Sequence, residues 1–66
     1  MNDREMLIED LAVAVEAAQT LVNRIGDVQK RTASLSKTAM WTALSEPYGH
    51  AYNAHRQLKT LLECME

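Results

Sequence analysis

The sequence has few of the residues that usually hold very small domains together. It contains a single cysteine, Cys64, so no disulfide can form within the chain. Phenylalanine is absent, and one tryptophan and two tyrosines supply all of the aromatic surface. A chain of 66 residues buries only about 60% of its unfolded surface and is marginally stable alone. Such chains usually depend on disulfides, a metal ion or association with another chain, and here disulfides are excluded.

Long apolar runs and a positively charged leader are also missing. No apolar run approaches the roughly 18 residues of a membrane-spanning helix. The N-terminal stretch lacks a basic segment followed by an apolar one, which is the pattern of a secretory signal. With only one cysteine, these absences predict a cytoplasmic protein without membrane contact. The formal net charge is −2, so nonspecific nucleic-acid binding is not the first expectation.

The patterns that accompany catalysis and metal binding are absent as well. The sequence has no glycine-rich phosphate loop, no nucleophile elbow and no clustered pair of carboxylates. His50 and His55 are five residues apart, whereas neighbours on one helix face are three or four apart. Cys64 has no second ligand pair beside it. We therefore predict no enzymatic activity, no cofactor and no metal site, and a metal or pH sensor built on the two histidines is the weakest alternative.

Apolar residues in the first half recur at alternating steps of four and three, the heptad spacing of coiled-coil helices, broken only by Thr32 in the same register. They are Leu7, Leu11, Ala14, Ala18, Leu21, Ile25, Val28 and Leu35. A second line, Ile8, Val15 and Val22, lies beside the first. Together they form a stripe about three residues wide per seven, which favours a bundle of several helices over a two-stranded coiled coil.

The second half shows the same spacing. Its apolar and aromatic line is Trp41, Leu44, Tyr48, Ala51, His55, Leu58, Leu62 and Met65. This line passes Pro47, which costs about 3 kcal/mol in a helix interior but little in a first turn. Because Ser45 is a suitable N-cap, we predict a kink or a break at Pro47. In an antiparallel hairpin of the two halves, Leu21 would lie near Tyr48.

Serine and threonine between the halves predict the bend, because their hydroxyls compete with helical hydrogen bonds. We expect one domain over residues 1–66, with helices at about 3–31, 37–45 and 46–65 and a bend at about 32–36. Asn2 or Asp3 would cap the first helix, and Ser34 or Ser36 the second.

The predicted fold is all-α: a long helical hairpin, with its second arm kinked or broken at Pro47, that pairs into an antiparallel four-helix bundle. Residues 1–20 carry five acidic residues and one basic, whereas residues 24–37 carry four basic residues and one acidic. Two hairpins stacked antiparallel would therefore bring opposite charges together. We expect Gly26 inside the first helix, because the apolar spacing continues beyond it. If Gly26 divided that helix, a monomeric three-helix bundle would become the alternative.

These features predict a small non-enzymatic protein–protein interaction module, acting as a regulator, an adaptor or a chaperone-like protein through helix–helix packing. We expect a homodimer or a helical protein partner. The residues predicted for self-association are Leu7, Leu11, Leu21, Ile25, Leu58 and Leu62. Trp41 and Tyr52 are predicted to contact a partner. The alternative is a nucleic-acid-binding regulator that uses the basic bend, with Arg24, Lys30, Arg31 and Lys37 against phosphates.

Overall fold

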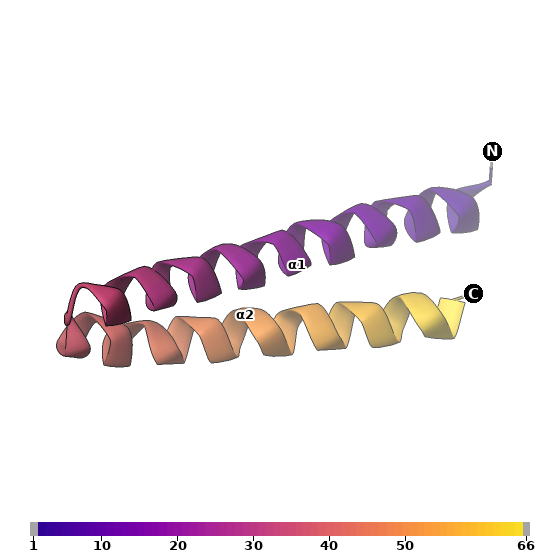
Figure 1. Ribbon diagram of the computed structural model, residues 1–66. Helices are drawn as coiled ribbons and strands as arrows, with labels where there is room; N and C mark the ends of the chain where they lie inside the picture. The colour runs from indigo at the N-terminus through magenta and orange to yellow at the C-terminus, as the bar shows by residue number, and fades with distance from the viewer. Residues whose placement is uncertain (1, 66) are drawn as a thin grey trace.

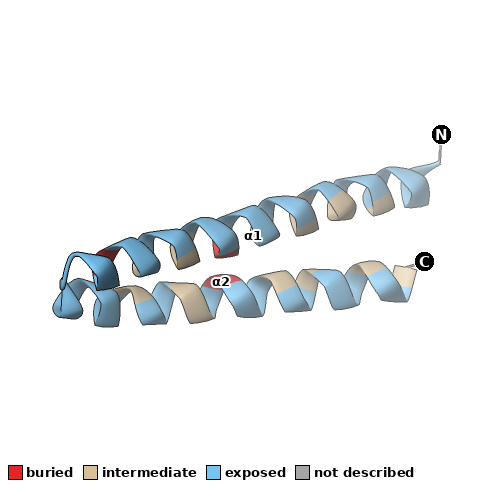
Figure 2. Cartoon of the chain, in the orientation of Figure 1, coloured by how far each residue is buried: buried red, intermediate tan, exposed pale blue. Residues whose placement is uncertain are grey.

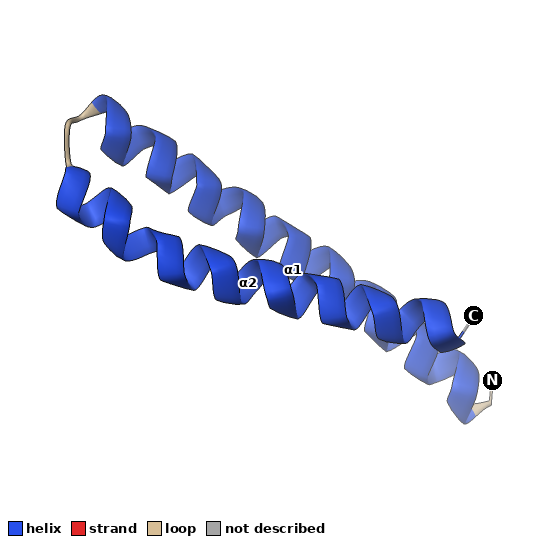
Figure 3. Ribbon diagram, turned by 90° about the horizontal axis from the view of Figure 1, so that it is seen from below, coloured by secondary structure: helices blue, strands red, loops and turns tan. Residues whose placement is uncertain are grey.

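The computed structural model describes residues 2–65 and shows an antiparallel helical hairpin (Figure 1). Helix α1 spans Asp3–Ser34, and helix α2 spans Thr38–Met65. The two helices run lengthwise beside each other, and the start of α1 and the end of α2 lie at the end opposite the turn (Figures 1 and 3). No strand occurs in the described part of the chain. The prediction of an all-helical hairpin is therefore confirmed.

The start of α1 follows from its first residues. The backbone of Asn2 is extended. Its side-chain oxygen accepts a hydrogen bond from the backbone N–H of Glu5, at 2.8 Å. Asp3 and Glu5 place negative charge in the first turn, where the helix dipole favours it. Asn2 thus caps α1, as predicted. The helix continues through Gly26 without a break, so the division required by the three-helix alternative is not seen.

The turn lies at residues 35–37. It begins three residues after the start of the predicted bend at about 32–36. The backbone N–H of Lys37 donates to the carbonyl of Thr32 at 2.8 Å, and that of Ser36 donates to Ala33 at 3.1 Å. This pair of bonds ends α1 in a Schellman motif. Ser34 and Ser36 do not cap α2. The Ser34 hydroxyl donates back to the Arg31 carbonyl within α1, and Ser36 is the left-handed residue of the motif, with φ 59°.

Ser36→Gly is expected to raise the free energy of unfolding by about 1 kcal/mol. A left-handed backbone costs an L-residue about 1–2 kcal/mol, and glycine avoids that cost. Urea unfolding followed by circular dichroism measures the change. Ser34→Gly is the matched control, because Ser34 is helical and glycine there should be destabilising by about 0.5 kcal/mol. Equal effects at the two positions would contradict the left-handed assignment.

Helix α2 passes through Pro47 as one continuous helix. The division into helices at about 37–45 and 46–65 is not seen, and neither the kink nor the break is confirmed. Proline removes the N–H that would reach the carbonyl of Ala43 one turn earlier. Both Ala43 and Pro47 are exposed, so water can hydrate that carbonyl. This hydration reduces the penalty that favoured a break.

The seam between the helices is a heptad line that keeps Leu11, Ala18 and Ile25 of the predicted α1 line but replaces each member between them by the next residue along the chain. Its α1 members are Ile8, Leu11, Val15, Ala18, Val22, Ile25, Gln29 and Thr32, all buried or half-buried. Burial gathers mainly where the helices face each other (Figure 2). Leu7 and Leu21 are exposed instead. Both lines fit the heptad spacing, and only the packing against α2 distinguishes them.

The register between the helices also differs from the prediction by about one turn. Gln29 donates through Nε2 to the Trp41 carbonyl at 3.2 Å and to Ser45 Oγ at 3.3 Å. A Cβ added to Gly26 would lie 3.6 Å from a ring carbon of Tyr48. Gly26, not Leu21, therefore lies opposite Tyr48. The shift follows from the later turn, because α1 extends to Ser34 rather than ending near residue 31.

Candidate interaction surface

The hairpin buries very little. Among residues 2–65 only Val22, Ala51 and Thr32 are buried, and no side chain is fully buried. The chain exposes 5142 Å², whereas a compact protein of 7.4 kDa exposes about 4,200 Å². Its radius of gyration is 15.3 Å, against about 11 Å for a compact chain of this length. The excess of about 900 Å² is close to the roughly 800 Å² that each partner contributes to a standard interface.

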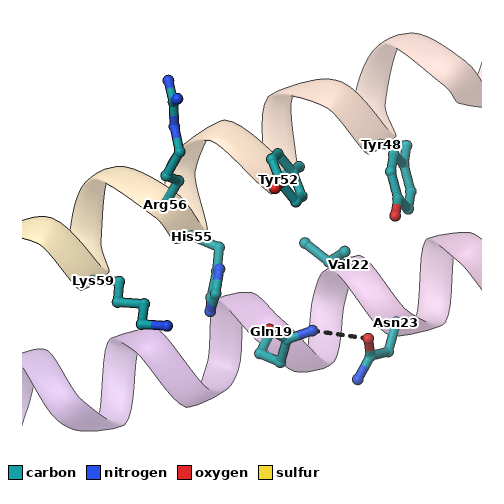
Figure 4. Close-up of a pocket in the computed structure, with 8 residues that line it drawn as sticks. All are labelled: Gln19, Val22, Asn23, Tyr48, Tyr52, His55, Arg56 and Lys59. Carbon is teal, nitrogen blue, oxygen red and sulfur yellow. Dashed lines mark hydrogen bonds between the residues drawn. The ribbon is translucent and has the colours of Figure 1, made fainter.

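The seam divides the hairpin into two sides with different chemistry. Gln19 of α1 lines one groove together with Tyr52 and Lys59 of α2 (Figure 4), so these positions share one side. Helical residues advance by about 100° each. A residue two positions further along therefore lies about 200° round its helix. By this geometry Leu21 of α1 and Leu61 of α2 lie on the side opposite the groove.

Apolar residues recur every seven positions along that second side. They are Leu7, Ala14, Leu21 and Val28 on α1, and Met40, Pro47, Ala54 and Leu61 on α2. We call these eight residues the apolar flank. All are exposed except Ala14, which is half-buried. Leu21 is 52% exposed and Leu61 is 55% exposed. The flank is contributed by both helices, and its residues recur along the length of the hairpin.

The groove on the other side is polar and aromatic, with a volume of about 380 Å³. His55 and Lys59 point toward α1 in Figure 4, whereas Arg56 points away. Gln19 Nε2 donates to Asn23 Oδ1 at 2.9 Å (Figure 4). No acidic side chain lines this groove. Because it lies opposite the apolar flank, a partner that covers the flank leaves the groove open.

The residues predicted for self-association fall into two groups. Leu11, Ile25, Leu58 and Leu62 are half-buried along the seam, so the hairpin itself uses much of their surface. Leu7 and Leu21 lie on the apolar flank and are exposed. The flank residues of α2 were not predicted to take part in self-association. The sequence does contain a pattern that indicates them, because Met40, Pro47, Ala54 and Leu61 are apolar and recur every seven residues.

The two predicted partner-contact residues are both exposed but lie apart. Trp41 follows the turn, and its backbone carbonyl accepts the hydrogen bond from Gln29. Tyr52 lines the polar groove on the side away from the apolar flank. A single helix laid on the flank would therefore not contact Tyr52.

The basic residues near the turn are also accessible. Arg24, Lys30, Arg31 and Lys37 are all exposed. Within residues 2–65 the only basic and acidic side chains within 4 Å of each other are His50 and Glu46, with Nε2 3.6 Å from Oε1. The four basic side chains therefore carry charge that no acidic neighbour of the described chain offsets at ion-pair distance.

The described residues offer no cluster that would hold a metal ion. His50 lies beside Glu46, His55 is half-buried at the seam, and Cys64 is exposed near the end of α2. Neither described helix has a stretch apolar enough to cross a lipid bilayer.

The fold and surface define this chain as an elongated helical hairpin with one apolar side and one polar side. No protein-family model, curated protein or solved structure matches it.

Proposed function

We propose that this protein is a non-enzymatic helix–helix interaction module that works through its apolar flank. Two helices laid on the flank would complete a four-helix bundle, the architecture predicted from the sequence. The observation that carries the proposal is the apolar flank itself, which is exposed except at Ala14, on a hairpin that has only three buried residues within 2–65. In soluble proteins, exposed apolar patches beyond the ordinary size mark interaction sites.

The energetic balance supports the same conclusion. Fully burying one large apolar side chain contributes about 1.5–3 kcal/mol. Leu7, Leu21, Val28, Met40 and Leu61 are each about half exposed, so covering them contributes on the order of 5 kcal/mol. That contribution is comparable to the whole stability of a small domain. The seam cannot replace it, because it includes Gln29, Thr32 and several alanines.

A module of this kind suits a cytoplasmic regulator, adaptor or chaperone-like protein. Each of these works by covering, releasing or bridging helices of a target, and an apolar helical surface binds such helices through residues at three- and four-residue steps. Trp41 and Tyr52 lie off the flank, and we propose them as additional contacts for a target.

Site-specific crosslinking in the native cells tests the proposal. A photoreactive phenylalanine derivative at Leu21 or Leu61 is expected to crosslink to a polypeptide, because both positions lie on the apolar flank. Met6 and Val13 are the matched controls, since they are 50% and 65% exposed but lie on the outer surface of α1. If the flank positions crosslink no more than these controls, the proposed function is wrong.

The runner-up proposal is a nucleic-acid-binding regulator. The observation that favours it is the exposure of Arg24, Lys30, Arg31 and Lys37 without an ion-pair partner in the described chain. Binding through these residues would weaken steeply with salt, because each neutralised phosphate releases counterions. Retention on a heparin column tests it: elution only at high salt, and earlier elution of the Arg31→Gln, Lys37→Gln variant, would support this function over the first.

A further inference from the structure

We propose that the helices covering the apolar flank belong to a second copy of this chain, packed antiparallel. In this dimer α1 lies against α1 of the second copy, α2 lies against α2, and the two turns are at opposite ends. This inference rests on the proposed function, because it names the occupant of the flank. The excess exposed surface matches the area that one partner contributes to a standard interface.

The charge distribution along the hairpin sets the direction. The open half, residues 3–20 and 52–65, carries six acidic and three basic residues. The turn half, residues 21–51, carries four basic and two acidic residues. The halves therefore have formal charges of −3 and +2. Antiparallel packing places each negative half on a positive half, whereas parallel packing places like charges together.

Charged residues beside the flank repeat this polarity on α1. One line of residues, seven apart, runs next to Leu7, Leu21 and Val28 on their outer side. It reads Asp3, Asp10, Ala17, Arg24 and Arg31. When two α1 helices pack antiparallel about a two-fold axis near Ala17, Asp10 of each copy faces Arg24 of the other. Asp3 and Arg31 face each other in the same way, so the dimer gains four pairs of opposite charge.

Parallel packing offers no such pairs. A two-fold axis along the hairpin would place α1 of one copy against α2 of the other. The corresponding outer line of α2 is Ala43, His50, Gln57 and Cys64. This line contains no residue with a full charge at neutral pH when histidine is uncharged. The aspartates and arginines beside the α1 flank would then lack partners of opposite charge.

The flank residues themselves fit the antiparallel arrangement. About the same axis, Ala14 faces Leu21 of the second copy, a small residue against a large one, and Leu7 faces Val28, so apolar residues meet apolar residues along the α1 flank. On α2 an axis near Ala54 places Pro47 opposite Leu61, whereas Met40 has no counterpart among the flank residues. Because Gly26 lies opposite Tyr48, the axis near Ala17 reaches α2 less than one helical turn from Ala54. The axis positions that the two helices require therefore agree to within about three residues of α2, or about 4.5 Å.

Solution mass and electron-spin distances test the inference on the full chain. Light scattering is expected to give a dimer. A spin label on the native Cys64, which is exposed, is expected at about 30 Å from its copy, from a 1.5 Å rise over about ten residues on each side of Ala54. A label on Thr38→Cys, with Cys64→Ser, is expected at about 50 Å by the same geometry. A parallel dimer would bring both pairs of labels within about 20 Å.

Charge exchange tests the pairing directly. Asp10→Arg or Arg24→Asp alone is expected to raise the dimer Kd by about tenfold at low ionic strength, because each change turns two attractions into repulsions. The double variant, with both changes, should recover most of the affinity. Asp27→Arg is the matched control, since Asp27 is exposed on the outer surface of α1 and its reversal should leave Kd nearly unchanged. Failure of the double variant to recover would overturn the proposed pairing.

The outcomes separate this inference from the proposed function. A dimer with short distances at both labels overturns the antiparallel arrangement but leaves the interaction module in place. A monomer that is unfolded or binds a hydrophobic dye overturns the second copy as occupant, and a different chain must then cover the flank. A cooperatively folded monomer that is indifferent to Leu21→Glu overturns both. Any mass larger than a dimer also overturns the inference.

Discussion

Leu21→Ala is expected to lower the free energy of unfolding by about 2–5 kcal/mol, the cost of deleting a buried leucine. In the isolated hairpin Leu21 is half exposed, so this cost arises only when another helix covers the apolar flank. Urea unfolding at several protein concentrations measures it. The unfolding midpoint of the parent should rise with concentration, because association stabilises the folded state by mass action.

Met6→Ala is the matched control for this prediction. Met6 is 50% exposed and Leu21 is 52% exposed in the same helix, but Met6 lies on the outer surface rather than on the flank. Its replacement should change the free energy of unfolding by less than about 0.5 kcal/mol. If both substitutions cost the same small amount, no second copy covers the flank in solution and the inferred dimer is wrong.

Val22→Ala is expected to lower the free energy of unfolding by about 2 kcal/mol, since two buried methyl groups and their packing are lost. Val22 is 6% exposed and lies at the seam, where Ala51 is also buried. This cost belongs to the hairpin itself and should persist at every protein concentration. Thermal and urea unfolding of the variant measure it.

Val13→Ala provides the comparison, because the chemical change is identical and the helix is the same. Val13 is 65% exposed, and alanine has the higher helix propensity, so this variant should be neutral or slightly more stable. A larger loss of unfolding free energy at Val13 than at Val22 would show that Val22 does not lie on the face of α1 that packs against α2.

Several features of the fold were predictable because they depend on neighbouring residues. Asn2 caps α1 because its side chain reaches the N–H of Glu5 three residues on. The three- and four-residue apolar steps predict helical structure in both halves, and the serine- and threonine-rich stretch separates the two arms. Gly26 stays helical because its neighbours on both sides hold the same phase. Each of these depends on interactions within one or two helical turns.

The position of the turn was less accessible to sequence reasoning. Serine at residues 34 and 36 suggested caps for the second helix, yet Ser36 adopts the left-handed conformation that glycine normally supplies. The motif forms because Lys37 and Ser36 can close hydrogen bonds onto Thr32 and Ala33. A local propensity for capping therefore gave way to the backbone bonds that end α1.

The candidate surface was only partly predictable for a related reason. Leu7 and Leu21 were identified correctly as apolar residues of a wide stripe, but the sequence assigned them to the same line as Leu11 and Ile25. In the structure the first pair is exposed on the flank, and the second pair is half-buried at the seam. A stripe three residues wide contains two lines with heptad spacing, and periodicity alone does not rank them.

By itself, the sequence determined that this chain forms helices, where the first helix begins, that the two helices pair lengthwise, and how charge is distributed along them. These properties follow from local hydrogen bonding, apolar spacing and composition. Only the tertiary structure decided that Val22 rather than Leu21 enters the seam, that Gly26 lies opposite Tyr48, and that α2 continues through Pro47. Those outcomes depend on how two helices pack against each other, because the contacts that select one phase and register come from residues distant in sequence.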